Sequence, residues 1–145
     1  MRIGVDSSVL VAALHANHPL HATASRWLHD AIPRHDLFLA PHSLLETYAV
    51  LTRLPGRWRV SPEEARHLLE SVRPHVRMTG AHRTDPWIFL ERMASIPVAG
   101  GAAYDFLIAE TLHEAGVQQI ATLNAEHFRR VAPALALLDL SAHSA

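Results

Sequence analysis

Short apolar runs, separated by polar and turn-forming residues, are the first pattern visible along this chain. Runs rich in Val, Ile and Leu are typical of buried strands when Gly, Pro or polar residues bound them. The pattern predicts strands at residues 2–6, 37–40, 75–78, 118–123 and 135–140. We expect the segment 75–78 to be a short edge strand.

Between these runs, apolar residues recur at spacings of three and four, which is the period of a helix with one buried face. Small polar residues stand where such helices would begin, and Pro or Gly stands near several of their ends. The candidate capping residues are Ser7 or Ser8, Ser61, and Thr84 or Asp85. The predicted helices cover residues 7–14, 19–31, 42–54, 61–72, 84–94 and 104–115.

Strands that alternate with helices indicate parallel pairing, because parallel neighbours need crossover connections. The sequence therefore predicts one layered α/β domain over residues 1–145, without internal repeats or a long linker. In open parallel sheets the functional crevice lies beyond the carboxyl ends of the strands. Asp6 and Asn124, which end the first and fourth predicted strands, are thus the first candidates for a site.

The composition of the chain excludes several kinds of site and of protein. The chain has 145 residues, no Cys and a formal net charge of −1, and all 13 of its basic residues are Arg. Disulfides, thiolate nucleophiles and Cys-based zinc sites are excluded, and there is no global basic field of the kind that marks a general nucleic-acid binder. The N-terminal segment lacks the features of a signal peptide, and no apolar stretch is long enough to span a membrane, so we expect a soluble, cytoplasmic protein.

Three acids occupy positions next to predicted apolar surfaces: Asp6, Glu46 and Asp105. Each has an ordinary explanation. Asp6 can cap the helix that follows it, Glu46 can pair with Arg53 or face solvent, and Asp105 can interact with the dipole of its own helix. The predicted wiring, however, brings all three around one crevice. Carboxylates that converge there repel one another, and a hard divalent cation such as Mg2+ relieves that repulsion.

Four segments occur in an order and at separations that resemble the PIN-domain ribonucleases, and most closely the VapC toxins of bacterial toxin-antitoxin pairs. They are VDSSVLVAAL (5–14), LLETYAVLTRLP (44–55), GGAAYDFLIAETLHEAG (100–116) and QIATLNAEHF (119–128). The resemblance covers nearly the whole chain. It implies a three-layer α/β/α fold whose five-stranded parallel sheet has the order 3-2-1-4-5.

The resemblance also assigns site residues. The three acids that the family uses to hold Mg2+, with Mn2+ as a substitute, match Asp6, Glu46 and Asp105. Ser8 matches a hydroxyl position that binds a water or a phosphate, although as a helix-capping group it is equally well explained. The fourth family position, often Asp, is Asn124 here. Asn offers a carbonyl oxygen and an amide donor but no negative charge. We therefore expect one resident metal ion in the free protein.

Residues near Asn124 leave alternatives open. Glu126 can substitute for the missing fourth acid or face solvent, and for His127 a hydrogen bond that holds the loop is favoured over metal ligation. His15, His18 and His21 could form a weak transition-metal cluster, but a solvated group is the better interpretation.

Other catalytic classes lack their motifs. The chain has no zinc-hydrolase histidine array, no nucleophile elbow and no phosphate-binding lysine loop. A response-regulator-like module would need paired acids after the first strand and a Lys after a late strand, and the chain has neither. The loop 53–59, with its three Arg residues and Trp58, suits single-stranded RNA, but an ordinary exposed loop explains it as well.

The resemblance implies a Mg2+-dependent endoribonuclease toxin that cleaves tRNA or ribosomal RNA, forms a homodimer and is neutralised by a cognate VapB-type antitoxin. Apolar helical surface around Trp27, Leu44 and Tyr48 is a candidate antitoxin contact, and Trp87 is expected in the core or in an interface. The alternative is a catalytically silent PIN-like module that binds RNA or protein. Asn124 is the residue that favours this alternative.

Overall fold

A parallel sheet organises the computed structural model, which describes residues 1–80 and 83–143. Within those residues the sheet has five strands in the order β3-β2-β1-β4-β5, all parallel, which confirms the predicted topology. The strands are β1 (Arg2–Val5), β2 (Asp36–Leu39), β3 (Arg77–Met78), β4 (Gln119–Thr122) and β5 (Ala136–Asp139). The short strand β3 lies at one edge, as expected.

Apart from α7, the helices follow the predicted pattern, with bounds that differ from the expected ones by at most two residues. They are α1 (Ser7–Leu14), α2 (His21–Ala31), α3 (Pro41–Arg53), α4 (Pro62–Val72), α5 (Pro86–Ser95), α6 (Ala102–Glu114) and α7 (Ala125–Arg129). Single 3-10 turns occur at Gly56–Trp58, Arg73–His75 and Ser141–His143. The short helix α7 directly follows Asn124.

Two of the three predicted helix caps are correct. Ser61 Oγ accepts a hydrogen bond from the Glu64 N–H at 3.2 Å, and the carboxylate of Asp85 accepts one from the Trp87 N–H at 2.9 Å. For α1 the cap is Asp6, which the sequence also allowed, rather than Ser7 or Ser8.

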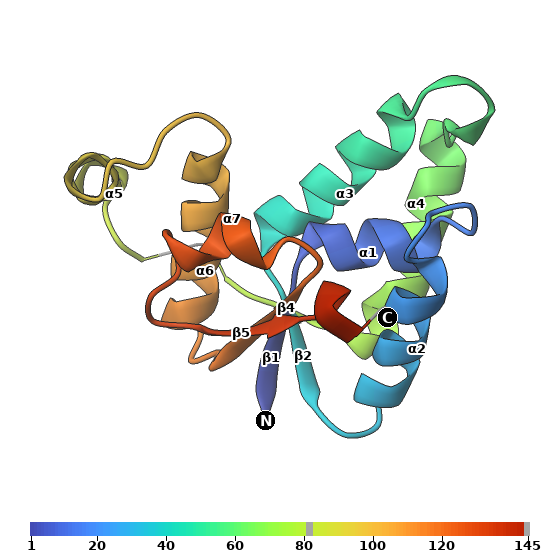
Figure 1. Cartoon of the computed structure of the whole chain (residues 1–145), viewed down its shortest axis with the longest axis horizontal. Helices are drawn as coiled ribbons and strands as arrows, with labels where there is room; N and C mark the ends of the chain where they lie inside the picture. The colour runs from blue at the N-terminus through green and yellow to red at the C-terminus, as the bar shows by residue number, and fades with distance from the viewer. Residues whose placement is uncertain (81–82, 144–145) are drawn as a thin grey trace.

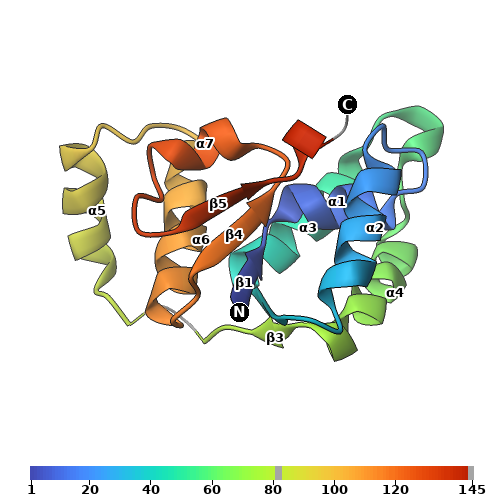
Figure 2. The same cartoon turned by 60° about the horizontal axis from the view of Figure 1, so that its bottom comes forward.

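Helices cover both faces of the sheet, as Figures 1 and 2 show. On one face, α1, α2 and α4 pack on strand residues such as Ile3, Val5 and Leu39. On the other face, α5, α6 and α7 form a second core around Ile120. This arrangement is the three-layer α/β/α architecture, and it leaves the carboxyl ends of β1 and β4 between the two groups of helices.

Gly4 lets helix α6 lie close against the sheet. A Cβ atom at Gly4 would stand 2.6 Å from Cδ1 of Leu112, a side chain that is fully buried. A larger residue would therefore push α6 away from β1. Because α6 also carries Asp105, this close approach sets the height of that acid above the sheet.

The two tryptophans singled out in the sequence differ in environment. Trp27 is half-buried and packs against the core under α2. The sequence left Trp87 either in the core or in an interface. A place in the core is wrong, because Trp87 is 75% exposed on α5.

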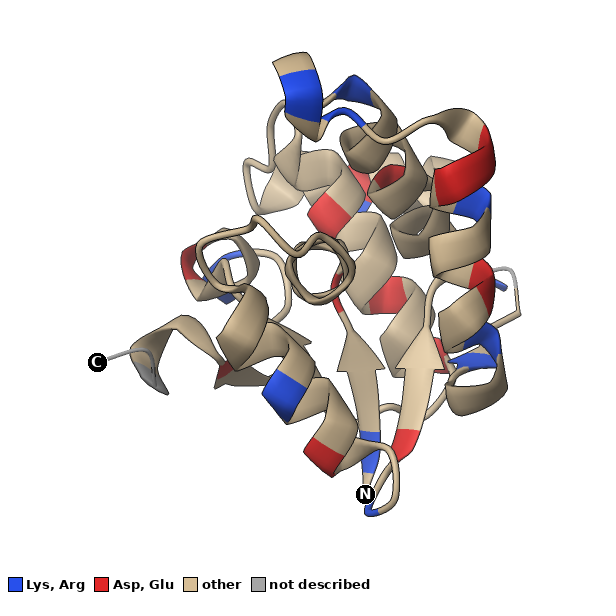
Figure 3. Cartoon of the chain, turned by 90° about the vertical axis from the view of Figure 1, so that its right-hand side faces the viewer, with Lys and Arg blue, Asp and Glu red and all other residues tan. Residues whose placement is uncertain are grey.

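None of the helices in the described part of the chain is long and apolar enough to cross a membrane. Figure 3 shows basic and acidic residues scattered over one side of the molecule.

Candidate active site

Asp6 is a buried carboxylate at the carboxyl end of β1. Its side chain is only 3% exposed. Oδ2 accepts hydrogen bonds from Ser8 Oγ at 2.5 Å and from Thr122 Oγ1 at 2.9 Å, together with a longer bond from the Ser8 N–H at 3.4 Å. Among residues 1–80 and 83–143, Oδ1 has only the Ser7 hydroxyl as a partner, at 3.4 Å. Asp6 is thus held through one oxygen, and the other has capacity for a further ligand.

The hydroxyl groups of Ser8 and Thr122, which both donate to Asp6, also connect this acid to the turn after β4. Ser8 Oγ accepts a hydrogen bond from the Leu123 N–H at 3.0 Å, and Thr122 Oγ1 accepts one from the Asn124 N–H at 2.9 Å. Each hydroxyl therefore donates its hydrogen to Asp6 and accepts one from the backbone. Ser8, predicted to bind a water or phosphate, acts in this structure as a positioning residue behind Asp6.

Glu46 lies in α3, and its Oε2 accepts a hydrogen bond from Ser7 Oγ at 3.0 Å. The same hydroxyl lies 3.4 Å from Asp6 Oδ1. Ser7 has one hydrogen, so it serves one carboxylate at a time and stands between the two. The alternative partner for Glu46, Arg53, is not used in the described structure.

Asp105 sits in the first turn of α6 and is half-buried. Burial first, and then the negative charges of Asp6 and Glu46, raise the pKa of its carboxyl group to about 6, while His127 opposes the shift. A raised pKa of this origin requires the other two carboxylates to be near. The three acids predicted from different parts of the sequence therefore share one electrostatic environment.

Glu46 and Asp105 line a cavity of about 610 Å³. Its remaining walls come from the loop 96–101 between α5 and α6, from the start of α6, and from residues of α7 and the turn that follows. In Figure 1 this loop and α7 lie on the same side of the sheet, beyond the ends of β1 and β4. The acids therefore border a space large enough for a small ligand.

The three candidate residues after β4 differ in their surroundings. Asn124 is exposed, and its side chain makes no capping bond to α7. The carboxylate of Glu126 is exposed and paired with Arg129, and Glu126 lines the same cavity as Glu46 and Asp105. The expectation that His127 holds the loop through its ring was wrong, because within the described residues its imidazole makes no hydrogen bond; it lines the cavity instead.

The donor set fits a hard divalent cation that keeps much of its own hydration. Among residues 1–80 and 83–143, no three His, Asp or Glu side chains meet as a ready-made metal centre. Mg2+, however, is usually bound by one or two carboxylates and completes its octahedron with waters and substrate phosphates. Asp6 Oδ1 can accept a further ligand, and the Ser7 hydroxyl joins it to Glu46. The charged form of Asp105 is destabilised by burial and by the charges of Asp6 and Glu46. These oxygen donors suit Mg2+ or Mn2+.

The histidines of the loop between α1 and α2 do not form such a centre. His15 Nε2 lies 3.0 Å from the Trp58 carbonyl, His18 Nδ1 accepts from the Leu20 N–H at 3.0 Å, and His21 Nδ1 lies 2.9 Å from the Ala12 carbonyl. These rings hold the loop through local hydrogen bonds.

Sequence reasoning missed Thr122 and Ser7. Thr122 is fully buried at the last position of β4 and follows Ala121, which pairs with Val5. Asp6 follows Val5 in the same register, so the two polar residues are neighbours across the strands. A Thr that ends an apolar strand beside another strand that ends in Asp was the signal available in the sequence.

Comparison with known proteins places the chain. Residues 3–133 match the family model described as PIN domain. The chain is 34% identical over 108 residues to Ribonuclease VapC27 of Mycobacterium tuberculosis (strain ATCC 25618 / H37Rv), which covers 74% of each protein. It is 31% identical over 118 residues to Ribonuclease VapC40 of Mycobacterium tuberculosis (strain CDC 1551 / Oshkosh), covering 80% of this chain and 82% of the relative.

A solved structure supports the same fold. The complex VapBC2 from Rickettsia felis, bound to a DNA fragment from its promoter, contains a chain that superposes with a TM-score of 0.71. The sequence identity is 16%, and the match covers 96% of this chain and 98% of that one. Together with the sequence matches, the order of the strands and the three clustered acids, this establishes that the chain belongs to the PIN-domain family and to its VapC ribonucleases.

Proposed function

We propose that this protein is a Mg2+-dependent endoribonuclease toxin that cleaves phosphodiester bonds of cytoplasmic RNA, with tRNA or ribosomal RNA as its substrate class. The observation that carries the proposal is the clustering of Asp6, Glu46 and Asp105, close enough for two of them to raise the pKa of the third. Repulsion of this kind costs stability unless a cation offsets it. The ribonuclease names of the two relatives support the same activity.

Asp6, Glu46 and Asp105 would hold the Mg2+ ion, and Mn2+ could replace it. A bound ion of this type supplies positive charge next to the phosphate and lowers the pKa of an attacking water. Ser8 and Thr122 fix the Asp6 carboxylate through Oδ2, which directs Oδ1 towards the shared site. Asn124 adds no charge, but its exposed amide can donate a hydrogen bond to a phosphate oxygen.

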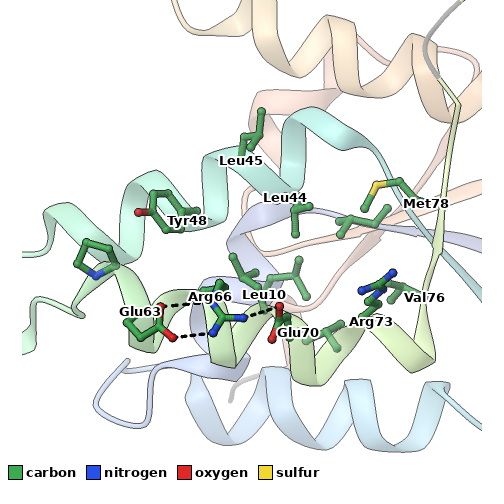
Figure 4. A pocket seen from close by; sticks show the side chains of 14 residues that line it. Leu10, Leu44, Leu45, Tyr48, Glu63, Arg66, Glu70, Arg73, Val76 and Met78 are labelled. Carbon is green, nitrogen blue, oxygen red and sulfur yellow. Dashed lines mark hydrogen bonds and ion pairs between the residues drawn. The ribbon is translucent and has the colours of Figure 1, made fainter.

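An antitoxin is the proposed partner, since the structural neighbour from Rickettsia felis is named as a VapBC complex. A groove of about 720 Å³ lies between α3 and α4, and Figure 4 shows Leu44, Leu45 and Tyr48 from α3 along one of its sides. Two of these residues belong to the surface expected from the sequence, whereas Trp27 packs on the core instead. We propose that an apolar helix of the antitoxin binds this groove.

The charged residues that line the groove indicate which kind of helix would bind there. Arg66 is held between Glu63 and Glu70, at 2.6 Å and 2.8 Å. Arg73 lines the same groove, and no ion pair engages it within residues 1–80 and 83–143 (Figure 4). An amphipathic antitoxin helix with an acidic residue at one end would match this pattern.

Helix α5 is the proposed homodimer contact. Trp87 is 75% exposed, Leu90 53% and the nearby Tyr104 on α6 56%. Large apolar side chains grouped in this way are typical of a surface that another chain covers. A second copy of this protein is the partner that the family resemblance implies.

The activity test uses the purified protein with total RNA, in Mg2+ and in chelator. Glu46→Gln and Asp105→Asn should each abolish Mg2+-dependent cleavage, because each removes a charged ligand while conserving shape. Glu126→Gln is the matched control, since that acid lies at the same cavity but is paired with Arg129. Circular dichroism shows whether each variant is folded.

The second candidate function is binding without cleavage, and Asn124 is the feature that favours it. Wild-type protein that binds RNA but leaves it uncut in both Mg2+ and Mn2+ would support this alternative over the nuclease. Restoring a fourth acid with Asn124→Asp would then be the informative variant, because cleavage gained in that variant would assign the silence to this position.

A further inference from the structure

The cavity beside the three acids is also lined by a basic residue. Arg130, the residue after α7, lines the same space of about 610 Å³ as Glu46 and Asp105. Within the described residues, Arg130 forms no ion pair, whereas its neighbour Arg129 is paired with Glu126. An arginine beside carboxylates ordinarily pairs with one of them. Here its guanidinium remains available, with five donors that match a phosphate.

The loop between α5 and α6 forms an apolar side of this cavity. Ile96 is 38% exposed, and the half-buried Val98 packs against the core. The imidazole of His127, in α7, lines the same cavity and has no hydrogen bond within residues 1–80 and 83–143. A flat apolar group would therefore meet an aliphatic surface and a ring. Nucleobases bind in such surroundings by stacking and apolar contact.

We propose that this cavity binds one nucleotide of the RNA next to the cleaved bond. Arg130 binds its phosphate, and its base contacts His127 and the aliphatic side chains of Ile96 and Val98. The inference rests on the proposed nuclease function, because it places the nucleotide beside Glu46 and Asp105. Its volume falls in the range of about 300–1,000 Å³ that small-ligand sites occupy.

Contact with the faces of a base restricts the substrate. A base that is stacked and paired in a duplex presents only its edge, so its ring is not free to contact Ile96, Val98 or His127. The nucleotide that binds here must be unpaired. The protein should therefore cleave at loops, bulges or single strands, with the choice of base set by the loop 96–98 rather than by the acids.

Titration with 5′-adenosine monophosphate tests the site without any bond to cleave. Nuclear magnetic resonance would follow His127 and the 96–98 amides, with and without Mg2+, against inorganic phosphate and adenosine as separate ligands. The nucleotide should bind more tightly than either fragment. Arg130→Gln should weaken it about tenfold, the loss of one charge-assisted contact. Arg129→Gln, with the same change in charge, should stay close to wild type, and Arg130→Lys should recover part of the affinity.

Cleavage of a single-stranded RNA supplies the second readout. Arg130→Gln should raise KM more than it lowers kcat, and its binding should show a salt slope lower by about one phosphate contact. Equal effects of the two Gln variants, or nucleotide shifts away from the cavity, would overturn the proposal. Binding of phosphate alone would overturn the part that concerns the base.

The two proposals fail in different ways. If the wild type never cleaves RNA yet binds the nucleotide through Arg130, the nuclease function fails and the nucleotide site stands. If the wild type cleaves and Arg130→Gln matches it in both assays, only the nucleotide site fails. Binding of an acidic peptide with no response to the nucleotide would identify a site for a protein side chain, and the present inference would be wrong.

Discussion

Thr122 Oγ1 donates a hydrogen bond of 2.9 Å to Asp6 Oδ2 across the neighbouring strands β4 and β1. The bond joins residues 116 positions apart in the chain, and the same hydroxyl accepts from the Asn124 N–H. Thr122 thereby links the first acid of the site to the turn that carries the fourth position. The hydroxyl makes the site a single unit rather than a set of separate side chains.

Replacing Thr122 by Val should destabilise the protein by about 1.5–3 kcal/mol, because a buried carboxylate loses a hydrogen bond while the shape is kept. Urea unfolding measures the change. Thr111→Val is the control, since that buried hydroxyl only returns to the Leu107 carbonyl at 2.7 Å in its own helix. Equal losses in the two variants would show that the contact with Asp6 has no special weight.

Asp105 should make stability depend on pH in the direction opposite to most acids. Its folded-state pKa of about 6 lies above the ordinary 3.8, through burial and then through Asp6 and Glu46. The folded protein therefore binds more protons than the unfolded chain between these values, and its stability falls as pH rises through that window. Above about pH 6, Asp105 is ionised in the folded protein too, and the full cost of its buried charge beside Asp6 and Glu46 lowers the stability.

Asp105→Asn should consequently be more stable than the wild type at about pH 8 and equal to it at about pH 3, where Asp105 is protonated in both states. Thermal unfolding without metal, at both pH values, measures the difference. Glu126→Gln should show no such dependence, because its partner is Arg129. A wild type that is the more stable protein at the higher pH would contradict the assignment.

Mg2+ should stabilise the wild type, and more strongly above the pKa of Asp105 than below it, because the ion competes with a proton there. The effect should disappear in Asp105→Asn and persist in Glu126→Gln. Calorimetry should show one site in the free protein, since Asn124 brings no fourth charge. Two tight Mg2+ or Mn2+ sites without RNA would contradict this expectation.

Leu45 and Leu90 offer a reciprocal test of the two proposed protein contacts. Leu45→Glu places a charge in the groove between α3 and α4, and should prevent co-purification of the antitoxin while the dimer persists. Leu90→Glu on α5 should do the reverse. Both side chains are more than half exposed, so neither variant should unfold. Size-exclusion chromatography with co-expressed antitoxin measures both outcomes, and the opposite pattern would exchange the two surfaces.

The position of the acids was predictable because parallel strands end at one edge of a sheet. Asp6 and Asn124 follow adjacent strands, and the helix periods bring Glu46 and Asp105 to the same edge. The hydrogen bonds behind them could be inferred only with the order and register of β1 and β4 in hand, since Ser8 and Thr122 become neighbours through that register. Periodicity likewise assigns Trp87 an apolar face, but does not say whether another helix of the same chain covers it.

The close contact between Gly4 and Leu112 gives the site a point of control outside it. Leu112 lies two helical turns along α6 from Asp105, roughly 10 Å at 1.5 Å per residue. A methyl group at Gly4 would push Leu112, and with it helix α6, away from the sheet. The carboxylate of Asp105, at the other end of that helix, would then move as well. Loss of function in a protein of this kind can therefore arise from a mutation that leaves every acid intact.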